Sequence, residues 1–575
     1  MTQASPGEAS KMPETAPQDV TEPKDVTEPT DAALVDGLLR PEDYPWRPTT
    51  VELVETHVSW VFLSGERVVK VKKPVDYGFV DHAALASRRR SCEDEVRLNR
   101  RLTDGVYLGV VPIVRDHTGR YRVVTQEDPV GTPVEWATLM RRLPEEGMLE
   151  ALLAAGTGPP HLADRLADRL VPFHRDGAAS CEGSANEVAA AASVVVTENL
   201  TELEPFVGRS LGPAQLGLVD EAMRDFIAEH ADLLRERAVA GWVREGHGDL
   251  RAEHICFETD GVVQVFDCVE FSRSLRCADV ASDLAFLLMD LDRLGEPEAA
   301  DALVARYRAA GFDLPESLLR FYKAHRALVR AKVACLSRAF AHRAARDDLA
   351  LEAAEYLNLA TADAVTVRPA LIAMTGLSGT GKSTVAAALA RALGAPIFSS
   401  DIVRKELAGR AGPAPAAWEQ GLYGPDQTEA TYGRLEELSR ETLVGGHAAI
   451  LDATFLDERR RERLATVAEG AGVPLVLVET VSTEGVALGR IVARARRGVS
   501  PSDATAEVYR RQRAAVRTSP PNVPRDAVHV VVDTTAGHPV CLDPVLVALC
   551  REAIIAARVP GAEDADTKET SHEGR

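Results

Sequence analysis

Apolar positions near the start of the chain have the period of β-strands. Between residues 51 and 73, apolar and polar residues alternate, with Gly65 inside the segment. A period of two is typical of a half-buried strand, and glycine favours a turn. The pattern therefore predicts a hairpin followed by a strand over residues 67–72. The spacing of apolar residues over 88–102 then predicts a helix.

The pattern changes twice further along the chain. Ala- and Leu-rich helical stretches fill residues 202–237 and 278–359. Strands followed by helices indicate an α+β domain. After Pro369, short apolar strands alternate with helical stretches, which indicates an α/β domain with a parallel, doubly wound sheet. The strands expected in this sheet are 371–375, 448–451, 475–478 and 528–532.

The length of the chain, 575 residues, is too great for one hydrophobic core, and its apolar fraction of 45% is that of a globular protein. The first 35 residues are rich in Pro, Glu, Thr and Asp and contain Asp-Val-Thr-Glu-Pro twice, so they bury too little apolar surface to order. We therefore expect two domains between two disordered tails. The predicted segments are a tail over 1–35, the α+β domain over 36–364, the α/β domain over 365–560 and a tail over 561–575.

The net charge of the chain is −21 at pH 7. A surface this acidic repels nucleic acid and anionic lipid, and it attracts cationic small molecules. The longest candidate apolar run, residues 188–196, is far shorter than the roughly 18 residues of a membrane span. The N-terminus has no signal-peptide pattern. We predict a cytoplasmic protein that binds neither nucleic acid nor membranes; the pattern leaves its oligomeric state open.

The eight cysteines are scattered along the chain and form no Cys-x-x-Cys pair. This arrangement argues against a disulfide framework and against a zinc ribbon. We expect most of them to be small buried residues.

A phosphate-binding motif opens the α/β domain. Residues 376–383 satisfy G-x-x-x-x-G-K-[ST] between an expected strand and an expected helix. The glycines let backbone N–H groups surround the β-phosphate, Lys382 reaches the β- and γ-phosphates, and the Ser383 hydroxyl ligates magnesium. The motif therefore predicts a site for ATP and Mg²⁺. The residues assigned to it are Gly376, Leu377, Ser378, Gly379, Thr380, Gly381, Lys382, Ser383 and Thr384.

Three polar side chains follow strands of the same domain. Asp401 and Arg404 come just after an expected strand, so they are placed over the sheet edge where an acceptor would bind. Asp452 closes the strand 448–451, where a carboxylate orients magnesium or its water. The pattern predicts Asp401 and Arg404 as substrate residues and Asp452 as a metal residue.

Four arginines, Arg490, Arg494, Arg496 and Arg497, precede a Gly-, Ser- and Pro-containing segment at 498–503. We interpret this region as a mobile lid that brings guanidinium groups, Arg494 among them, to the transferring phosphate. The alternative is an exposed charged helix face.

Residues 370–555 resemble the small P-loop kinases of the gluconate-kinase, shikimate-kinase and zeta-toxin type. The resemblance rests on the P-loop, on Asp401-x-x-Arg404, on Asp452-Ala453-Thr454 and on the arginine-rich segment. It implies that Asp401 contacts the acceptor hydroxyl and acts as the base.

A second set of catalytic residues lies in the α+β domain. His247-Gly248-Asp249 is followed by an apolar strand that ends at Asp267, which is the layout of a kinase catalytic loop and a metal-binding aspartate. Asp249 is placed to accept the hydroxyl proton, and Asp267 to bind magnesium. Arg251 would neutralise the γ-phosphate.

Two lysines on the expected strand 67–72 share one face. Lys70 matches the Val-Ala-Ile-Lys pattern of kinases better than Lys72, and Glu95 on the following helix is its expected ion-pair partner. The pattern leaves open which lysine binds phosphate. The alternative is a solvated pair of lysines and an ordinary helical glutamate.

Residues 40–350 resemble the aminoglycoside phosphotransferase family of the protein-kinase-like fold. The anchors are His247-Gly248-Asp249, the strand before Asp267, and Asp279 with Asp283, which in the family support the catalytic loop. The order of the two domains resembles bacterial proteins described as bifunctional aminoglycoside phosphotransferase and ATP-binding proteins. The resemblance implies an ATP- and magnesium-dependent phosphotransferase that acts on an alcohol group of a small hydroxylated molecule.

The α+β domain departs from this family at two points. His254 stands where the family has a magnesium-binding asparagine, and a G-x-G-x-x-G loop is missing before Lys70. Three hypotheses therefore stay open: an enzyme with two phosphotransfer sites, a regulatory protein with a pseudokinase half and a P-loop switch, and a toxin-like kinase whose first half restrains the second.

Overall fold

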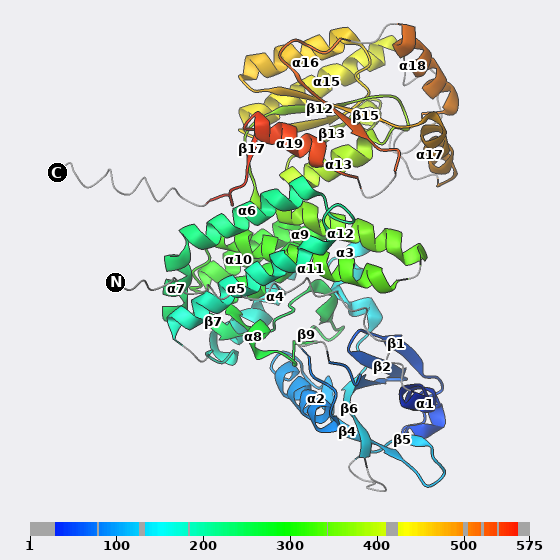
Figure 1. Cartoon of the computed structure of the whole chain (residues 1–575), viewed down its shortest axis with the longest axis vertical. Helices are drawn as coiled ribbons and strands as arrows, with labels where there is room; N and C mark the ends of the chain where they lie inside the picture. The colour runs from blue at the N-terminus through cyan, green and yellow to red at the C-terminus, as the bar shows by residue number, and fades with distance from the viewer. Residues whose placement is uncertain are drawn as a thin grey trace, which may run out of the picture. The chain divides into compact units, whose positions relative to one another are not determined.

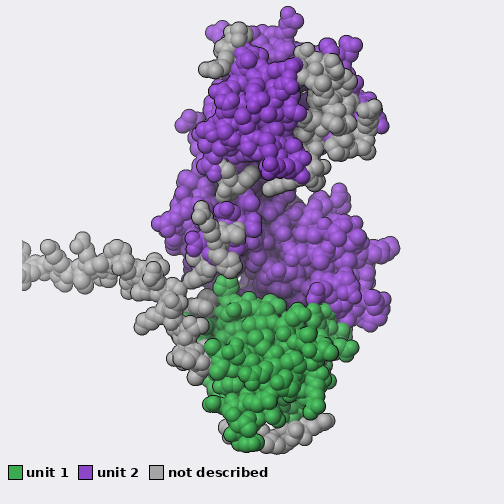
Figure 2. All heavy atoms as spheres, turned by 90° about the vertical axis from the view of Figure 1, so that its right-hand side faces the viewer, with its two compact units in different colours: residues 1–100, 104–143 green, residues 101–103, 144–575 purple. Residues whose placement is uncertain are grey.

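The fold is described by a computed structural model (Figure 1), in which two compact units are distinguished (Figure 2). Unit 1 contains residues up to 100 and residues 104–143, and unit 2 contains residues 101–103 and the chain from Pro144 onward. The expected boundary near residue 365 lies inside unit 2, between a long helix and a short strand. The described residues are 29–76, 80–125, 133–181, 184–341, 343–409, 424–497, 504–518, 522–536 and 540–561.

Unit 1 is built on a six-stranded antiparallel sheet with the order β1-β2-β3-β6-β4-β5. The hairpin expected over 51–73 is present, and Gly65 occupies its turn with a φ of +68°. Val69 and Val71 of β3 lie in the core of the unit. The strands are β1 (Glu52–Glu55), β2 (Ser59–Ser64), β3 (Arg67–Lys72), β4 (Tyr107–Arg115), β5 (Tyr121–Val123) and β6 (Pro133–Arg141).

Two helices accompany this sheet. Helix α2 (Leu85–Asn99) begins and ends three residues before the expected 88–102. Helix α1 (Pro29–Leu38) corrects the expected tail over 1–35, because its residues 29–35 are ordered in a helix. Leu34 and Leu38, one helical turn apart, are buried in the same core as β3. Residues 1–28 and 562–575 of the predicted tails lie outside the described residues.

The first part of unit 2 is helical and has one large apolar core. Its central helix α9 is buried along most of its length, and α11 packs against both α9 and α12. Two short antiparallel strand pairs are present: β7 pairs with β10, which follows it at a distance in the sequence, and β8 forms a hairpin with β9. The helices are α3 (Leu149–Ala154), α4 (Leu162–Pro172), α5 (Ala185–Leu203), α6 (Pro213–Glu229), α7 (Ala231–Val239), α8 (Arg273–Arg276), α9 (Val280–Arg293), α10 (Pro297–Ala309), α11 (Glu316–Phe340) and α12 (Arg343–Ala364). The short strands are β7 (Val243–Glu245), β8 (Ile255–Phe257), β9 (Val263–Val265) and β10 (Cys277–Asp279).

A five-stranded parallel sheet with the order β13-β14-β12-β15-β16 forms the rest of unit 2. Consecutive residues of a strand point to opposite faces, and here both faces are covered. Ile372 and Met374 pack with α13 and α19, whereas Leu371 and Ala373 pack with α15 and α16. The strands are β12 (Leu371–Thr375), β13 (Ile397–Ser399), β14 (Ala449–Asp452), β15 (Leu475–Val481) and β16 (Val528–Asp533); β11 (Thr366–Val367) pairs with β17 (Ile555–Ala556). The helices are α13 (Lys382–Leu393), α14 (Ser400–Leu407), α15 (Pro425–Val444), α16 (Glu458–Ala471), α17 (Glu484–Arg497), α18 (Ala506–Thr518) and α19 (Asp543–Arg551).

One disulfide corrects the expectation for the cysteines. Cys181 and Cys277 are bonded although they are 96 residues apart in the sequence. The chain folds back so that Cys277, on β10, meets Cys181, and a pair this distant has no local sequence pattern. Four other cysteines are buried, as expected: Cys92, Cys256, Cys268 and Cys335.

Within the described part of the chain, no helix is both long enough and apolar enough to cross a membrane.

Candidate active sites

The phosphate-binding loop connects the central strand β12 to the first turn of α13. Gly376, Gly379 and Gly381 have φ values of +127°, +81° and +92°, a region that other residues adopt only with strain. A Cβ at Gly376 would lie 2.5 Å from the backbone oxygen of Thr480. The glycines of the motif are therefore required by the shape of the loop.

Lys382 lies at the start of α13 and turns back over the loop. Its Nζ donates to the backbone oxygen of Leu377 at 2.8 Å. Burial lowers the pKa of Lys382 to about 8, although the carboxylates of Asp452 and Asp401 act in the opposite direction. The ammonium group is therefore a partly buried charge within electrostatic reach of both candidate aspartates.

Ser383 and Asp452 are brought together at the carboxyl edge of the sheet. The Ser383 hydroxyl hydrogen-bonds to Asp452, whose pKa burial raises. A hydroxyl and a carboxylate are hard oxygen donors, which fit magnesium when it completes its shell with phosphate and water. In the described residues, no group of three or more His, Cys, Asp and Glu side chains is arranged to hold a metal on its own.

Thr380 and Thr384, the other hydroxyl residues of the motif, make hydrogen bonds that stabilise the loop. The Thr380 hydroxyl donates to the Leu377 oxygen at 2.8 Å and lies 2.7 Å from the Thr480 hydroxyl. Thr384 lies in the first turn of α13, and its N–H donates to the Gly381 oxygen.

The two expected substrate residues lie on α14, directly after β13. Asp401 is in the first turn of this short helix. Arg404 is buried, and its Nη1 donates to the Thr428 hydroxyl of α15 at 3.1 Å. Both residues therefore lie near the carboxyl edge of the parallel sheet, which is also the edge where α13 begins with Lys382.

Two arginines of α17, Arg490 and Arg494, make different contacts. Arg490 donates to the hydroxyl and to the backbone oxygen of Thr534, at 2.9 and 2.6 Å. Arg494 donates to the Ala504 oxygen at 3.3 Å, and it is close enough to Lys382 to lower the pKa of that lysine. The expected lid segment, 498–503, lies outside the described residues.

Unit 1 contains the expected lysine pair. Lys70 Nζ lies 2.7 Å from Glu95 Oε1 and Lys72 Nζ 2.9 Å from Glu95 Oε2. The Lys72 side chain is fully buried, whereas that of Lys70 is 13% exposed. Because solvent reaches only Lys70, this lysine is the better candidate for a phosphate ligand.

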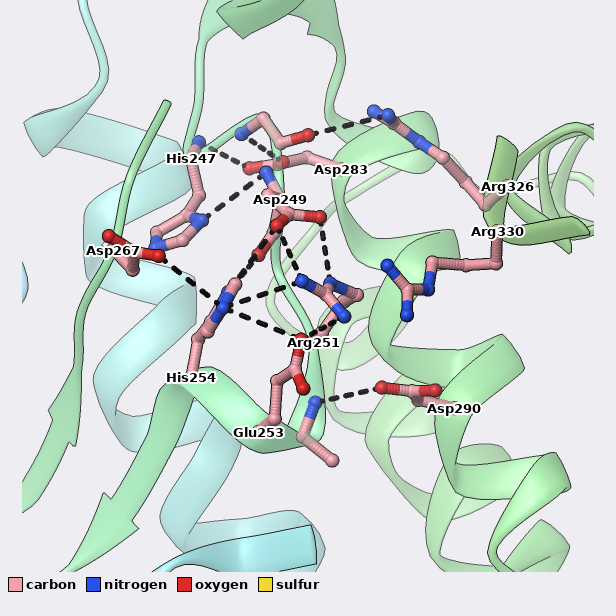
Figure 3. Close-up of polar contacts among 12 residues, drawn as sticks. His247, Asp249, Arg251, Glu253, His254, Asp267, Asp283, Asp290, Arg326 and Arg330 are labelled. Carbon is pink, nitrogen blue, oxygen red and sulfur yellow. Dashed lines mark hydrogen bonds and ion pairs between the residues drawn. The ribbon is translucent and has the colours of Figure 1, made fainter. Parts of the chain in front are cut away.

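The loop His247-Gly248-Asp249 of unit 2, the candidate catalytic loop, follows β7, and Figure 3 shows its polar contacts. Arg251 binds Asp249 with two hydrogen bonds, Nε to Oδ1 at 2.8 Å and Nη2 to Oδ2 at 2.9 Å. Burial acts to raise the pKa of Asp249, but Arg251 and His254 outweigh it and leave this pKa below its usual value. Arg251 also contacts Glu253, so it lies between two carboxylates.

Asp283 on α9 fixes the backbone of this loop (Figure 3). Its carboxylate accepts the N–H groups of His247 and Gly248, at 2.7 and 2.8 Å, and it lies 3.0 Å from His174 Nε2. Burial lowers the pKa of His247 to about 4, so its ring is neutral and Nε2–H donates to the Phe266 oxygen.

Comparison with known proteins places the chain in a family. An AAA domain family matches residues 371–519. The uncharacterized protein Rv2004c of Mycobacterium tuberculosis (strain ATCC 25618 / H37Rv) is 34% identical over 464 residues, which are 80% of this chain and 88% of that protein. The chain belongs to the same family as Rv2004c.

Two solved structures show weaker similarity. A gluconokinase from Sinorhizobium meliloti 1021 is 22% identical and matches 32% of this chain and 94% of its own, with a TM-score of 0.23. The GDP complex of wild-type aminoglycoside 2'-phosphotransferase-IIIa is 15% identical and matches 54% of this chain and 92% of its own, with a TM-score of 0.32.

The predicted fold class is confirmed for this member of the Rv2004c family. The N-terminal part is an α+β domain, with an antiparallel sheet followed by helices. The C-terminal part is a P-loop domain with a parallel sheet and an AAA-domain sequence.

His254 and Asp267 form the other expected metal pair. His254 Nδ1 lies 2.9 Å from the backbone oxygen of Asp249, which can only accept, so Nδ1 carries the proton. Its Nε2 lies 3.4 Å from Arg251 Nη2 and 3.6 Å from Asp267 Oδ2. Asp267 has a φ of +63°, which is unusual for a residue other than glycine. Asp267 thus fits magnesium, whereas the nitrogen of His254 is a poor ligand for this ion.

Several residues of these sites were missed by reasoning from the sequence. Arg326 donates to the Gly248 oxygen, and Arg330 lies close enough to Asp249 to lower its pKa. Asp290 accepts the N–H of Ala252. Asp290 lies on α9, and Arg326 and Arg330 lie on α11. In the sequence they look like the charged residues of any helix, and no motif marks them. Gln512 of α18 accepts the N–H of Ser378 in the phosphate-binding loop, 134 residues away.

Proposed function

We propose that the protein is an ATP- and magnesium-dependent phosphotransferase with two separate nucleotide sites, acting on alcohol groups of small molecules. The observation that carries the proposal is the partly buried ammonium of Lys382 over a glycine-shaped loop, next to the paired oxygens of Ser383 and Asp452. A loop with a cation over it and hard oxygen donors beside it is suited to bind a nucleoside triphosphate with magnesium.

At the P-loop site, Lys382 would hold the β- and γ-phosphates, and Ser383 and Asp452 would hold the ion. Magnesium, when bound there, would neutralise charge that develops on the phosphate oxygens. Asp401 would accept the proton of the acceptor hydroxyl, and Arg404 would orient that acceptor. Arg494 would add positive charge near the transferring group. The net charge of −21 favours a small acceptor over nucleic acid.

At the second site, Asp249 would accept the acceptor's proton and Asp267 would hold magnesium. Arg251 would turn from Asp249 to the γ-phosphate, which frees the carboxylate for its role as a base. Within unit 1, taken by itself, Glu95 holds Lys70 in place, and Lys70 would be a cation suited to bind phosphate.

One observation favours a different role for this second site. Arg251 occupies both carboxylate oxygens of Asp249 and also approaches Nε2 of His254. If these contacts persist with nucleotide bound, the domain binds a ligand without transfer and is a regulatory pseudokinase.

Single-turnover transfer from labelled ATP tests the proposal in the full chain, with sugars, amino sugars, nucleosides and aminoglycosides as acceptors. Lys382→Ala should abolish transfer and nucleotide binding at the P-loop site, because it removes a charge without core volume. Unchanged binding and turnover would refute the P-loop site.

The second site is tested in the Lys382→Ala background, where the P-loop site is silent. Asp249→Asn should keep magnesium-dependent ATP binding and lose transfer, whereas Asp267→Asn should weaken the magnesium dependence of binding. His254→Asn should preserve or raise transfer. If the domain shows no transfer, and His254→Asn gains only binding, the regulatory role is correct.

A further inference from the structure

One peptide group of the phosphate-binding loop is held at both ends. The peptide between Leu377 and Ser378 offers its oxygen to Lys382 Nζ, at 2.8 Å, and to the Thr380 hydroxyl, at 2.8 Å. Its N–H donates to the side-chain oxygen of Gln512, at 2.9 Å. Because a peptide is planar, fixing the N–H also fixes the direction of the carbonyl oxygen that receives Lys382.

The bond to Gln512 is buried on both sides. Gln512 is 7% exposed and Ser378 8% exposed. A buried N–H without an acceptor is unfavourable, so loss of the Gln512 oxygen would force the peptide to turn or to admit water.

Helices α17 and α18 pack against this part of the loop. Ala487 and Ile491 of α17 form an apolar cluster with Tyr509 of α18, and Leu377 packs against it. A Cβ at Gly379 would lie 2.6 Å from the Ala487 oxygen. Gln512 therefore approaches the loop from a packed surface that limits its own freedom.

The other contacts of the loop hold different groups. Thr480 and Thr534 bond to Thr380, and the Thr454 oxygen accepts the N–H of Gly376. For the 377–378 peptide, Gln512 supplies the contact to the N–H, and the contacts to the oxygen come from within the loop.

We propose that Gln512 is a positioning residue of the P-loop nucleotide site, which sets the orientation of the 377–378 peptide and thereby directs the Lys382 ammonium toward phosphate. This inference rests on the proposed function of that site. Gln512 acts through Lys382 and the loop backbone, without itself contacting the reacting atoms. A nucleotide would find the loop already shaped and the cation already aimed, which is the advantage of preorganisation in binding.

Two variants of similar size separate the acceptor from the shape of the side chain. Gln512→Met keeps the length of the side chain and removes the carbonyl oxygen. Gln512→Glu keeps an oxygen that accepts the Ser378 N–H but adds a buried negative charge, which salt screens little, so this variant should also bind an anionic ligand less tightly. Arg511→Ala is the matched control, because Arg511 neighbours Gln512 on α18 but points to solvent and pairs with Glu507.

The probe is MgATP, titrated into the full chain, with the binding that Lys382→Ala removes taken as the P-loop component. Gln512→Met should raise the Kd of this component about tenfold or more, with a small change in melting temperature. At 0.5 M salt, the Met variant should not recover its affinity, because it loses a hydrogen-bond acceptor and gains no charge. Arg511→Ala should bind as the wild type does.

The possible failures are distinguishable. Loss of affinity in Lys382→Ala with unchanged affinity in Gln512→Met would overturn the role of Gln512 and leave the P-loop site intact. A melting temperature that falls in Gln512→Met while its affinity stays unchanged would also overturn it, because the side chain is then only structural. Absence of any Lys382-dependent MgATP binding in the wild type would overturn the proposed function and this inference together. Should Gln512→Met not fold, Gln512→Asn, whose carbonyl is one methylene short, is expected to raise the Kd, and an unchanged Kd would overturn the role.

Discussion

The side chain of Lys382 illustrates how one buried charge couples binding to pH. Desolvation disfavours the charged form of a lysine, and here it lowers the pKa to about 8 in spite of Asp452 and Asp401. A phosphate ligand would reverse this effect, since an anion stabilises the ammonium. Proton uptake and nucleotide binding should therefore be linked at this residue.

The affinity for MgATP at the P-loop site should depend on pH in one direction. Below about pH 8, Lys382 is protonated before the ligand arrives, and the Kd should be nearly constant. Above that pH the free protein must first take up a proton, so the Kd should rise toward about tenfold for each further pH unit. Titration calorimetry from pH 6.5 to 9.5 measures this. Lys382→Arg, which stays charged, should flatten the curve; a flat wild-type curve would contradict the buried ammonium.

The carboxylate of Asp283 holds the backbone of the loop His247-Gly248-Asp249, a role that its position in the sequence only suggests. Hydrogen bonds from His174 and the N–H groups of His247 and Gly248 outweigh burial and hold the pKa of this carboxyl well below its usual range. The catalytic loop therefore depends on a carboxylate that is charged at neutral pH.

Asp283→Asn should remove roughly 3 kcal/mol from the free energy of unfolding, because an amide cannot accept all of these donors. Denaturant titration measures the loss. Transfer at the Asp249 site should fall with it. Asp232→Asn is the control, since Asp232 is exposed and pairs only with Arg235 on the helix surface, and its stability should match the wild type. Equal stability of both variants would show that Asp283 does not hold the loop.

At the scale of elements, the phosphate-binding loop and α17 are fitted to each other at Gly379. This glycine has a φ of +81°, and an added Cβ would meet the Ala487 oxygen at 2.6 Å. Glycine is thus needed both for the backbone conformation and for the approach of the helix.

Gly379→Ala should therefore raise the Kd for MgATP about tenfold or more, because strain of about 1–2 kcal/mol is added where the loop must keep its shape. Gly489→Ala on the facing helix α17 is the matched control. Its Cβ would meet nothing within 4 Å, so alanine should stabilise the helix by about 0.5–1 kcal/mol and leave the Kd unchanged. If the two alanine variants bind MgATP with the same Kd, the loop accepts a Cβ at residue 379, and the requirement for glycine there is wrong.

Sequence patterns predicted the elements whose signals are local. The period-two run placed β3 at residues 67–72, and the apolar run placed β12 at 371–375. Helix α1 was missed because its first residues continue the Pro-, Glu- and Thr-rich sequence of the predicted tail, yet Leu34 and Leu38 meet a core that the sequence cannot show.

Within the sites, the motifs named the residues that carry charge, but not how they pair. The sequence spacing placed Arg251 two residues from Asp249, and only the structure shows both oxygens of that aspartate engaged. Gln512 and the Cys181–Cys277 disulfide depend on contacts between residues 134 and 96 positions apart, for which no pattern exists in a single sequence.

At the scale of the whole molecule, the P-loop domain and the catalytic loop belong to one compact unit. Helix α13, which begins at Lys382, packs on α12, and Arg391 contacts Glu355 across that interface. Helix α12 in turn packs on α11, whose Arg326 donates to the Gly248 oxygen. The two candidate sites are thus carried by a continuous set of helices, and each has its own cation and its own carboxylates.

The chain should therefore bind two MgATP molecules, and single substitutions should remove them one at a time. Calorimetry of the full chain should give a stoichiometry of about two for the wild type and about one for Lys382→Ala, since this change leaves Asp249 and Asp267 in place. Asp267→Asn should weaken only the other component and make it less dependent on magnesium. The double variant should keep only this weakened component, with little dependence on magnesium. A wild-type stoichiometry of one, abolished by Lys382→Ala, would leave the P-loop as the only nucleotide site and would make the kinase-like half a domain that acts without ATP.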